Sequence, residues 1–583
     1  MNCSNKFKLT AVAMMVGTAM NANAALYQVV EVEPEVNGDV LDYQTAYGVA
    51  IQQGDVENPG TNAPFALGCF DAGANCTSDQ FKLAIETRAE PISVGQAVDG
   101  VSYREEVPFA MDSSFYTVDN TSDAGDDEDF KRYCYNELGY STCDSWAALN
   151  WKPWQKEKFY KEYEASNALV VVEGKPDAYN NKYNNVINSL TESLSVIGNQ
   201  SVVDENDSTL ETRNTAVAPE LPNIITEQGQ ASVVESHAWN TDGTFTVGSV
   251  SRKATNTNGT HHTSKAAIWD DTGLVSELAW PSNQAEDGER LAQGSMRDLK
   301  ADGLTIYGVG YNTYSDNNYM NATVFIGSLE KEGSLENVEW VNKSVDGAQQ
   351  RIDDETVHTN SRLTDVNDNF VAIGEAKRSG RYPMPTGSYP NRLFIVKDIR
   401  ESSPKAFYPT SGIFFNGAGG LMGSINASNE VVGQLDAESS REDEGKPRRK
   451  RGFIYPYSPD GTDSDRSKTL FEGKAWFLDN LTNGGEFSQE NNAFRIINAT
   501  DINDAGVISA TAMKCEGGYK STQHNASCDG TEKIVAVKLM PIAGATSADI
   551  QKRSIEEESS ERQGAGLGWL ALTMLGFFGF RRK

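Results

Sequence analysis

The chain has 583 residues, with 51 Lys and Arg against 82 Asp and Glu, which gives a formal net charge of −31 at pH 7. This acidic balance argues against a nucleic-acid partner, because phosphate binding needs a clustered cationic surface. Hydrophobic residues make up 38% and aromatic residues 9% of the chain, enough for a packed core, so global disorder is also disfavoured. The length allows several domains or one large repeat assembly.

The first 24 residues have the three parts of an export signal. Two lysines precede an apolar run over 9–20, and small residues at 22–24 form a cleavage site. We therefore expect a signal peptide over 1–24, cleavage between Ala24 and Ala25, and the export machinery as a partner. The alternative interpretation is a buried N-terminal helix.

Strand-like segments follow, with an interruption. Residues 47–50 and 65–67 fit a first blade, and 195–198 fit the end of a later unit. From 121 to 167 an acidic stretch, two cysteines and a group of aromatic residues have a spacing that is more helical than stranded. We expect a small helical, disulfide-pinned insertion over 121–167.

The strongest internal signal is a strand-like phrase that recurs five times. An Asn or Asp near its start and a following turn pair supply the geometry of a tight hairpin, β-branched residues then favour a half-buried strand, and a small residue ends the phrase. A second apolar strand follows each phrase. The phrases span 239–248, 298–308, 365–374, 424–433 and 501–510.

A single hairpin of this kind cannot bury its own face, so neighbouring units must stack. Units of ~60 residues fit four-stranded propeller blades with long loops. We therefore predict an all-β, β-propeller-like repeat assembly of about six or seven blades over 25–546, including the insertion. A polar stalk rich in Ser and Glu is predicted over 547–563.

Six cysteines remain once the signal is removed, and they fall in three short-range pairs. The sequence alone cannot choose among the connectivities. Proximity favours local disulfides, because loop closure costs least over short separations and exported compartments are oxidising. Zinc is the competing interpretation, but no Cys-x-x-Cys motif occurs. The predicted disulfides are Cys69–Cys76, Cys134–Cys143 and Cys515–Cys528.

The last 20 residues, 564–583, join a small-residue motif, a short apolar run and a basic end. About 15 apolar residues are short of the ~20 that span a bilayer comfortably, but they suit a short transmembrane helix whose terminal cations stay on the cytoplasmic side. An ordinary tail anchor facing the periplasm is the alternative. The candidate sorting-signal residues are Gly564, Gly566, Arg581, Arg582 and Lys583.

Two resemblances to bacterial families follow from these motifs. The phrases at 424–433 and 501–510, with 493–494, resemble the HAF-type extracellular repeats, which pair an Ile-Asn-x-x-Gly-x-Val-Val-Gly hairpin with an Ala-Phe-aromatic strand. The tail resembles the GlyGly-type C-terminal sorting signal of Gram-negative bacteria, which a rhomboid-type protease cuts. Together they are similar to an uncharacterised exported family. The resemblance implies the outer cell surface or the extracellular space as location, and it supplies no catalytic residues.

Enzyme and metal motifs are weak in this sequence. No Gly-x-Ser-x-Gly elbow and no His-Glu-x-x-His helix occurs, so no catalytic residue is assigned. The phrases beginning at Asp365 and Asp501 imitate the first oxygen positions of a calcium loop, but hairpin turns with Asx side-chain bonds explain them as well. No cofactor is expected beyond Ca²⁺, for which the acidic cluster Asp460, Asp463 and Asp465 supplies the candidate ligands.

The one dense basic run, 446–451, follows the acidic residues 442–444. Local pairing can neutralise this run. The functional alternatives are a contact with an anion or a glycan phosphate, or a protease-sensitive loop.

These observations predict an exported binding or scaffold module that contacts a cell-envelope component or an extracellular polymer. The alternative is an extracellular hydrolase or lyase that uses carboxylates in the central channel; a third hypothesis is a structural surface-layer component. An enzyme should bring two or more carboxylates and a cation into one pocket, whereas a binding module should expose aromatic patches. The signal and tail carry +5 between them, so the exported body carries −36.

Overall fold

A computed structural model provides the structure. It describes residues 25–36, 39–40, 43–88, 131, 144, 168–175, 186–204, 209–217, 233–256, 259–287, 290–315, 318–348, 350–352, 355–358, 361–377, 391–439 and 448–554. The predicted signal peptide, most of the predicted stalk and the sorting tail lie outside the described residues. Only Lys131 and Asp144 of the predicted insertion are described, and both are helical.

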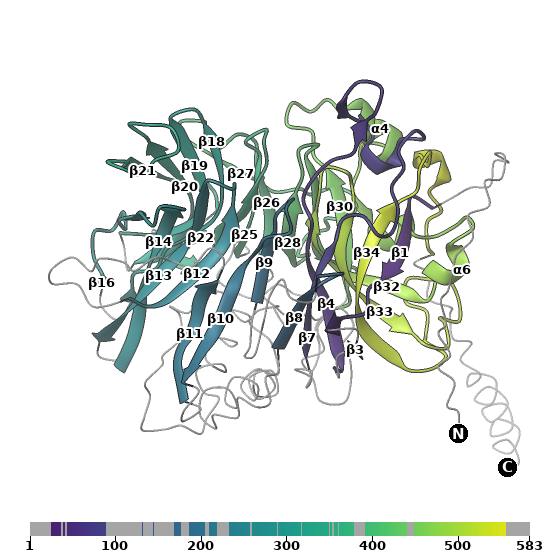
Figure 1. Ribbon diagram of the computed structural model, residues 1–583, viewed down its shortest axis with the longest axis horizontal. Coiled ribbons are helices and arrows are strands. Elements are labelled where there is room, and N and C mark those ends of the chain that lie inside the picture. The colour runs from purple at the N-terminus through teal and green to yellow at the C-terminus, as the bar shows by residue number, and fades with distance from the viewer. Residues whose placement is uncertain are drawn as a thin grey trace, which may run out of the picture.

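The fold is all-β, as the sequence predicts. Seven antiparallel sheets, which we call blades 1 to 7 in chain order, pack one after another in a closed ring (Figure 1). Blades 1 and 2 have three described strands each: β4 (Thr45–Ile51), β7 (Leu83–Arg88) and β8 (Ala168–Val172), then β9 (Val186–Leu190), β10 (Val196–Asp204) and β11 (Thr209–Val217).

Blades 3 to 6 have four strands each, in chain order across the sheet. Blade 3 is β12 (Val233–Thr241), β13 (Phe245–Asn256), β14 (Gly259–Asp270) and β15 (Val275–Glu277); blade 4 is β18 (Ser295–Asp302), β19 (Thr305–Tyr314), β20 (Tyr319–Ser328) and β21 (Glu339–Ser344). Blade 5 is β24 (Arg362–Val366), β25 (Ala372–Lys377), β26 (Asn391–Val396) and β27 (Ala406–Phe407); blade 6 is β28 (Gly420–Ile425), β29 (Glu430–Asp436), β30 (Lys450–Pro456) and β31 (Trp476–Phe477).

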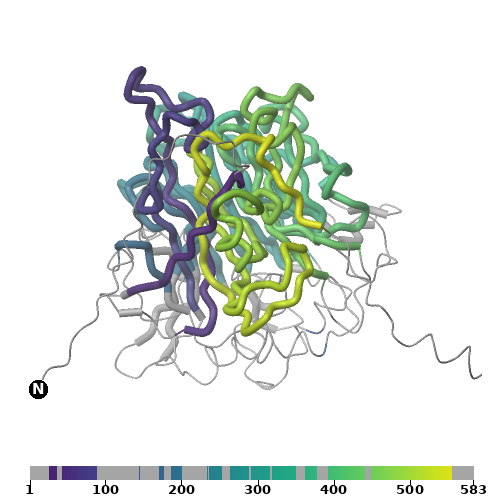
Figure 2. The backbone as a smooth tube through the Cα atoms, turned by 90° about the vertical axis from the view of Figure 1, so that its right-hand side faces the viewer, coloured from purple at the N-terminus to yellow at the C-terminus, as the bar shows by residue number. Residues whose placement is uncertain are grey.

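Blade 7 joins the two ends of the described chain. It contains β32 (Phe494–Ile502), β33 (Ile508–Cys515) and β34 (Glu532–Pro541), and β1 (Tyr27–Glu31) pairs with β34 as its outer strand. The N-terminal and C-terminal segments therefore lie side by side (Figure 2). The ring is closed by this pairing.

Short elements lie between the blades or in loops within them. The two-stranded ribbons are β2 (Glu35–Val36) with β3 (Asp39–Val40), β5 (Glu57–Asn58) with β6 (Ala63–Pro64), β16 (Glu286–Asp287) with β17 (Arg290–Leu291), and β22 (Gln350–Ile352) with β23 (Glu355–His358). Helices among the described residues include η1 (Gly68–Phe70), α4 (Asp465–Phe471), α5 (Leu478–Leu481), α6 (Ser488–Asn491) and η5 (Ser547–Asp549).

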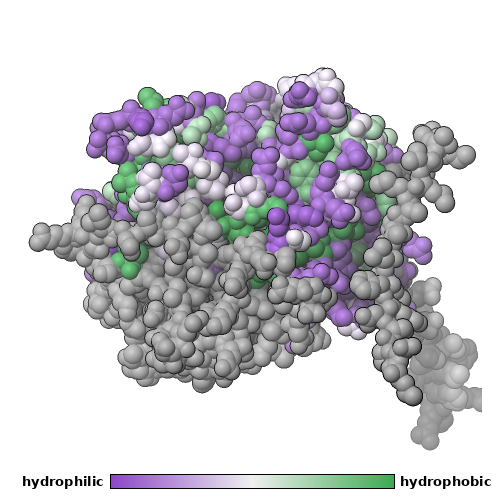
Figure 3. Space-filling model, in the orientation of Figure 1, coloured by the Kyte–Doolittle hydropathy of each residue, from purple (hydrophilic) through white to green (hydrophobic). Residues whose placement is uncertain are grey.

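The hydrophobic core is a series of interfaces between successive blades. Between blades 3 and 4, for example, Val247 packs in one cluster with Leu299 and Phe325. The cluster between blades 6 and 7 joins Val432 to Ile496. Each blade therefore buries its faces against its two neighbours, as expected of repeats that cannot fold alone. The described part of the surface in Figure 3 is mostly hydrophilic, in keeping with the acidic composition.

Candidate binding site on the ring axis

A cavity of about 1370 Å³ lies on the axis of the ring. All seven blades line it, so its wall is built from residues far apart in the sequence. One lining residue from each of blades 1 to 7 is Val49, Asn188, Asn240, Asp298, Asp365, Ser424 and Asp501.

A β-bulge interrupts the innermost strand of each blade from 3 to 7. The register shifts fall between Ala238 and Asn240, Met296 and Asp298, Leu363 and Asp365, Met422 and Ile425, and Ala499 and Asp501. A bulge bends the strand and re-aims its side chains. Residues within these bulges line the cavity, among them Trp239 in blade 3, Arg297 in blade 4 and Thr364 in blade 5.

The small residue that ends each phrase is explained by the same geometry. Gly248 pairs with Ala238, and Gly374 pairs with Leu363, directly beside the bulges. A Cβ at either glycine would collide with a carbonyl oxygen of the inner strand. In blade 4 the corresponding residue is Gly310, which pairs with Met296, and not Gly308. The predicted phrase is therefore out of register by two residues in that blade.

In blades 4, 5 and 7 an aspartate follows the bulge and ties its blade to the next. Asp298 accepts hydrogen bonds from Asn240 Nδ2 of blade 3 (2.7 Å) and from the backbone N–H of Val366 in blade 5 (3.0 Å). Asp365 accepts from Ser424 Oγ (2.6 Å) and from the Ile425 N–H (2.9 Å) of blade 6. The carboxylates of Asp298 and Asp365 thus satisfy backbone donors of the neighbouring sheet.

Asp501 closes the same pattern across the seam between blades 7 and 1. Its Oδ2 accepts from the Ile51 N–H (2.9 Å) and from Gln53 Nε2 (3.1 Å), and its Oδ1 accepts from the Ile502 N–H (2.9 Å). Because the three carboxylates hold blade-to-blade contacts, their first role is structural.

The asparagine two positions later serves both its own hairpin and the next blade. Asn367 Oδ1 accepts from the N–H groups of Asn369 and Val371 (both 3.1 Å), while its Nδ2 donates to the Asn426 carbonyl (2.8 Å). Asn503 accepts from the Val507 N–H (2.9 Å) and donates to a blade 1 carbonyl. The Asx-turn interpretation is therefore confirmed for Asn367 and Asn503.

Burial raises the pKa of two of these carboxyl groups. Burial raises the pKa of Asp298 well above its ordinary value, and the neighbouring Asp365, with which it shares a hydrogen bond, raises it further. Burial also raises the pKa of Asp501 to about 7, with the charge of Asp365 adding to the effect and backbone donors opposing it.

The protein is expected to lose stability as the pH rises from about 4 to about 7. Between these pH values the folded state holds a proton at Asp501 that the unfolded state has released. The stability that this proton contributes is fully present below the pKa of the unfolded state, and it is lost as the pH rises through the pKa of the folded state. Asp501→Asn should remove on the order of 2 to 4 kcal/mol of the pH-dependent change in unfolding free energy. Urea denaturation at pH 5 and pH 8 measures it, with Asp242→Asn on an exposed hairpin as control. An unchanged pH dependence in Asp501→Asn would contradict the assignment.

The cations that line the cavity are already engaged. Arg297 stacks over the ring of Trp239, with the guanidinium carbon 3.5 Å from the ring centroid. Arg362 pairs with Glu375 (3.1 Å), and Lys300 pairs with Asp368 (2.8 Å). These three cations face eight lining carboxylates, so the cavity is acidic overall. The lining carboxylates are Asp55, Glu192, Asp242, Asp298, Asp365, Glu375, Asp501 and Asp504.

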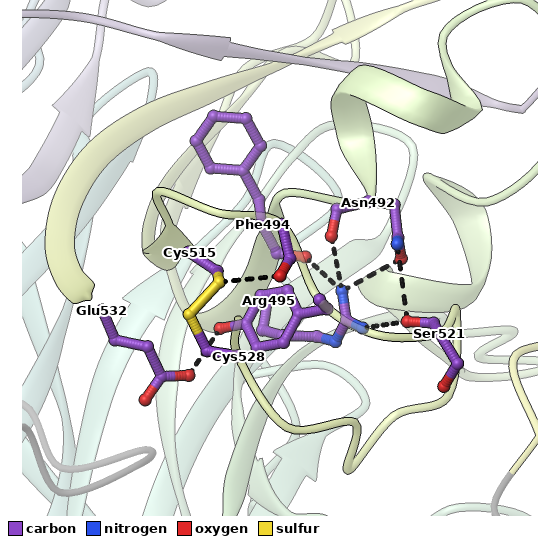
Figure 4. Close-up of a disulfide and its surroundings, with 9 residues drawn as sticks. Asn492, Phe494, Arg495, Cys515, Ser521, Cys528 and Glu532 are labelled. Atoms are coloured by element: carbon purple, nitrogen blue, oxygen red, sulfur yellow. Dashed lines mark hydrogen bonds between the residues drawn. A yellow bond between two sulfur atoms is a disulfide. The ribbon is translucent and has the colours of Figure 1, made fainter. Parts of the chain in front are cut away.

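Two of the three predicted disulfides are confirmed. Cys69 is bonded to Cys76 with 5.7 Å between Cα atoms, and Cys515 to Cys528 with 5.6 Å. Figure 4 shows the second disulfide beside Arg495, close to the loop that follows β33. Both disulfides close short loops at blade 7 or beside it. Cys134 and Cys143 lie outside the described residues.

The three predicted calcium ligands are not brought into one group. Asp460 pairs with Lys397 (3.2 Å), Asp463 accepts from Ser458 Oγ (2.8 Å), and Asp465 begins α4. Within the described ranges, no group of three or more His, Cys, Asp and Glu side chains could hold a metal ion.

Three residues of the basic run 446–451 are buried and do not form an exposed surface for an anion or a glycan phosphate. Arg448, Lys450 and Arg451 are buried at the start of blade 6 strand β30 or just before it. Arg448 pairs with Asp436 (2.9 Å), and burial lowers the pKa of Lys450 to about 7. The anion-contact hypothesis is therefore wrong for these three residues. Their burial next to a strand partner could not be read from a run of charges.

A buried arginine cluster was missed by the sequence reasoning. Arg451, Arg495 and Arg553 surround Asp479 of α5, and each is almost fully buried. Their guanidinium groups also donate to carbonyl oxygens of the disulfide loop, from Ser521 to His524. These arginines are 44 and 58 positions apart in the sequence. No local motif marks them.

No helix in the part of the chain that the structure describes is long and apolar enough to cross a membrane. The candidate sorting residues at 564–583 and the cleavage site at Ala24 and Ala25 are not tested by this finding, since all except Ala25 lie outside the described residues. Ala25 itself is buried at the start of the segment that leads into β1.

A family model described as "Protein of unknown function (DUF3466)" matches residues 224–583, which is more than half of the chain. No curated protein matches the chain significantly. Similar solved structures include an α-L-arabinofuranosidase mutant from Fusarium graminearum in complex with an iminosugar inhibitor, with 8% identity and a TM-score of 0.28 over 59% of this chain and 89% of that chain.

Two other solved structures give comparable values. An α-L-arabinanase from Penicillium chrysogenum complexed with arabinobiose has 9% identity and a TM-score of 0.25 over 59% of this chain and 89% of that one. A GH32 β-fructofuranosidase from Bombyx mori has 9% identity and a TM-score of 0.27 over 89% and 94%. TM-scores this low carry no argument about the activity of the present chain.

Proposed function

Since the chain belongs to the DUF3466 family, whose description assigns no activity, we propose a function from its geometry: a binding or scaffold module that holds a partner in the cavity on the ring axis. The single observation that carries this proposal is a cavity of about 1370 Å³ to which all seven blades contribute. A site of this size on a rigid ring can hold several residues of an extended polymer.

We propose a segment of a cell-envelope component or of an extracellular polymer as the partner. Eight carboxylates and three engaged cations favour a neutral or cationic segment over an acidic one. The signal-like residues 1–24 and the tail at 564–583 support export to the outer cell surface or beyond it, with a rhomboid-type protease processing the tail.

The test compares two tryptophans. Trp239 lines the cavity, whereas Trp340 lies on β21 at the outer side of blade 4, and both are partly exposed. The mature protein is incubated with a glycan array and with solubilised envelope fractions. Trp239→Ala should weaken binding at least about tenfold, while Trp340→Ala should leave it unchanged. Equal binding by both variants would contradict a cavity site.

One observation favours a second candidate function, an extracellular hydrolase or lyase. Asp501, with a pKa of about 7, shares the cavity with the Glu375 carboxylate and the Arg362 guanidinium. An acid poised near neutral pH is what proton transfer requires. The three donors already bonded to Asp501 place this candidate second.

Release of reducing or unsaturated sugar ends from neutral polysaccharides at pH 6 decides between the two functions. Turnover by the mature protein that is lost in both Asp501→Asn and Glu375→Gln would establish the enzyme. Binding without turnover supports the module.

A further inference from the structure

An exposed aromatic pair lies on the outer side of the ring, at the seam between blades 5 and 6. Phe407 of β27 is 48% exposed and is the one aromatic among the strongly exposed large hydrophobic residues of the described chain. Its ring lies 5.9 Å from that of Tyr457, which directly follows β30 and is partly exposed. We call these two residues the seam pair.

The seam pair is held rigidly from below. Tyr457 contacts Tyr455 with ring centroids 6.1 Å apart, Tyr455 contacts Phe414 at 5.4 Å, and Phe414 contacts the buried Phe453 at 5.6 Å. This row of rings runs from the core of blade 6 to the surface. Because the rings are already ordered, the protein side chains lose little conformational entropy when a ligand stacks on Phe407.

Polar groups of both charges stand beside the pair. Lys397 follows Val396, which pairs with Ala406 next to Phe407, and its Nζ lies 3.2 Å from Asp460 Oδ1. Both side chains are more than half exposed, so their remaining hydrogen-bonding positions face water. An apolar ring face with a donor and an acceptor beside it matches a sugar ring, which has an apolar C–H face and a rim of hydroxyl groups.

The size of the seam pair argues against a protein partner, and the charge around it argues against an acidic polymer. A stable protein interface buries about 800 Å² per partner, far more than one exposed ring and a second partly exposed ring offer. The surroundings are charged and the body carries an excess of acidic residues, which disfavours an acidic polymer.

We propose that the seam pair Phe407 and Tyr457, with Lys397 and Asp460 beside it, is a stacking site for a neutral glycan chain. It is separate from the cavity on the ring axis, whose lining includes none of these residues. The proposal therefore stands or falls independently of the proposed function.

The experiment is affinity gel electrophoresis of the mature protein in gels that contain hydroxyethylcellulose, laminarin or galactomannan, with alginate as the acidic polymer. We expect retardation by at least one neutral polymer, about tenfold weaker in Phe407→Ala and retained in Phe407→Tyr. Val341→Ala is the matched control, because Val341 is 57% exposed on the outer strand of blade 4. This control should be retarded like the unmodified protein.

Three results would overturn the proposal: no retardation by any neutral polymer, equal retardation of Phe407→Ala and the unmodified protein, or retardation by alginate alone. Sedimentation velocity adds a fourth. A dimer that Phe407→Ala converts to a monomer would identify a second copy of the chain as the occupant. Thermal unfolding of each variant confirms that the surface changes leave the fold intact.

Discussion

Asp479→Asn is expected to lower the free energy of unfolding by about 3 to 5 kcal/mol, because it leaves buried positive charge without its carboxylate. Asp479 is 1% exposed, and its Oδ2 lies 3.1 Å from Arg451 Nε. Burial alone would raise its pKa, but Arg451, Arg553 and Arg495 outweigh burial and hold the pKa below its ordinary value. The carboxylate therefore stabilises the fold above the unfolded pKa, and that contribution is lost as the pH falls through the folded one.

Chemical denaturation at pH 7 measures the loss. The matched control is Asp398→Asn, which removes the carboxylate of an Asp–Arg pair at the surface, where Arg400 is 44% exposed. Surface pairs contribute about 1 kcal/mol or less. If both variants lost the same amount, Asp479 would not be the counter-charge of the cluster. Hydrogen exchange should also quicken in the loop of Ser521 to His524, whose carbonyls the arginines hold.

Arg466→Met is expected to have an effect of similar size, again about 3 to 5 kcal/mol. Arg466 on α4 donates from Nε to Glu430 Oε1 (2.6 Å) and from Nη2 to Glu430 Oε2 (3.0 Å). Glu430 is 1% exposed and belongs to β29, so the variant leaves a carboxylate buried in blade 6 with the Asn426 amide as its remaining side-chain donor.

Urea denaturation again provides the measurement, with Arg400→Met at the surface as control. Arg466→Lys should recover only part of the loss, because an ammonium group cannot make both parallel bonds. Full recovery by lysine would show that charge alone matters at this position, against the bidentate geometry.

The repeated phrases predicted the fold because each of them contains its own hairpin. Asn367 and Asn503 form turns with donors only a few residues away, so their sequence is sufficient to locate the strands that follow. Neighbouring cysteines likewise predicted two disulfides, since short loops close most readily. The position of the bulge was not predicted, and without it the closing glycine of blade 4 was placed at Gly308 in place of Gly310.

The candidate site could not be predicted from the sequence as well as the fold. Its wall takes residues from every blade, and which inner-strand side chains face the axis depends on bulges that no local pattern marks. The burial of the basic run 446–451 also could not be predicted from local sequence. Arg448 and Arg451 look like surface cations until Asp436 and Asp479 are brought beside them by separate elements. Partners this distant are known only when the chain is folded.

The pairing of β1 with β34 makes the presence of β34 a condition for closing the ring. Tyr27 lies opposite Pro541, so the first strand described finds its partner only when the last strand described is present. Because the chain is synthesised from its N-terminus, β1 forms first and has no partner strand while the first six blades assemble. A chain stalled on the way would remain an open ring, accessible to proteases. Closure of blade 7 thus distinguishes finished molecules from unfinished ones.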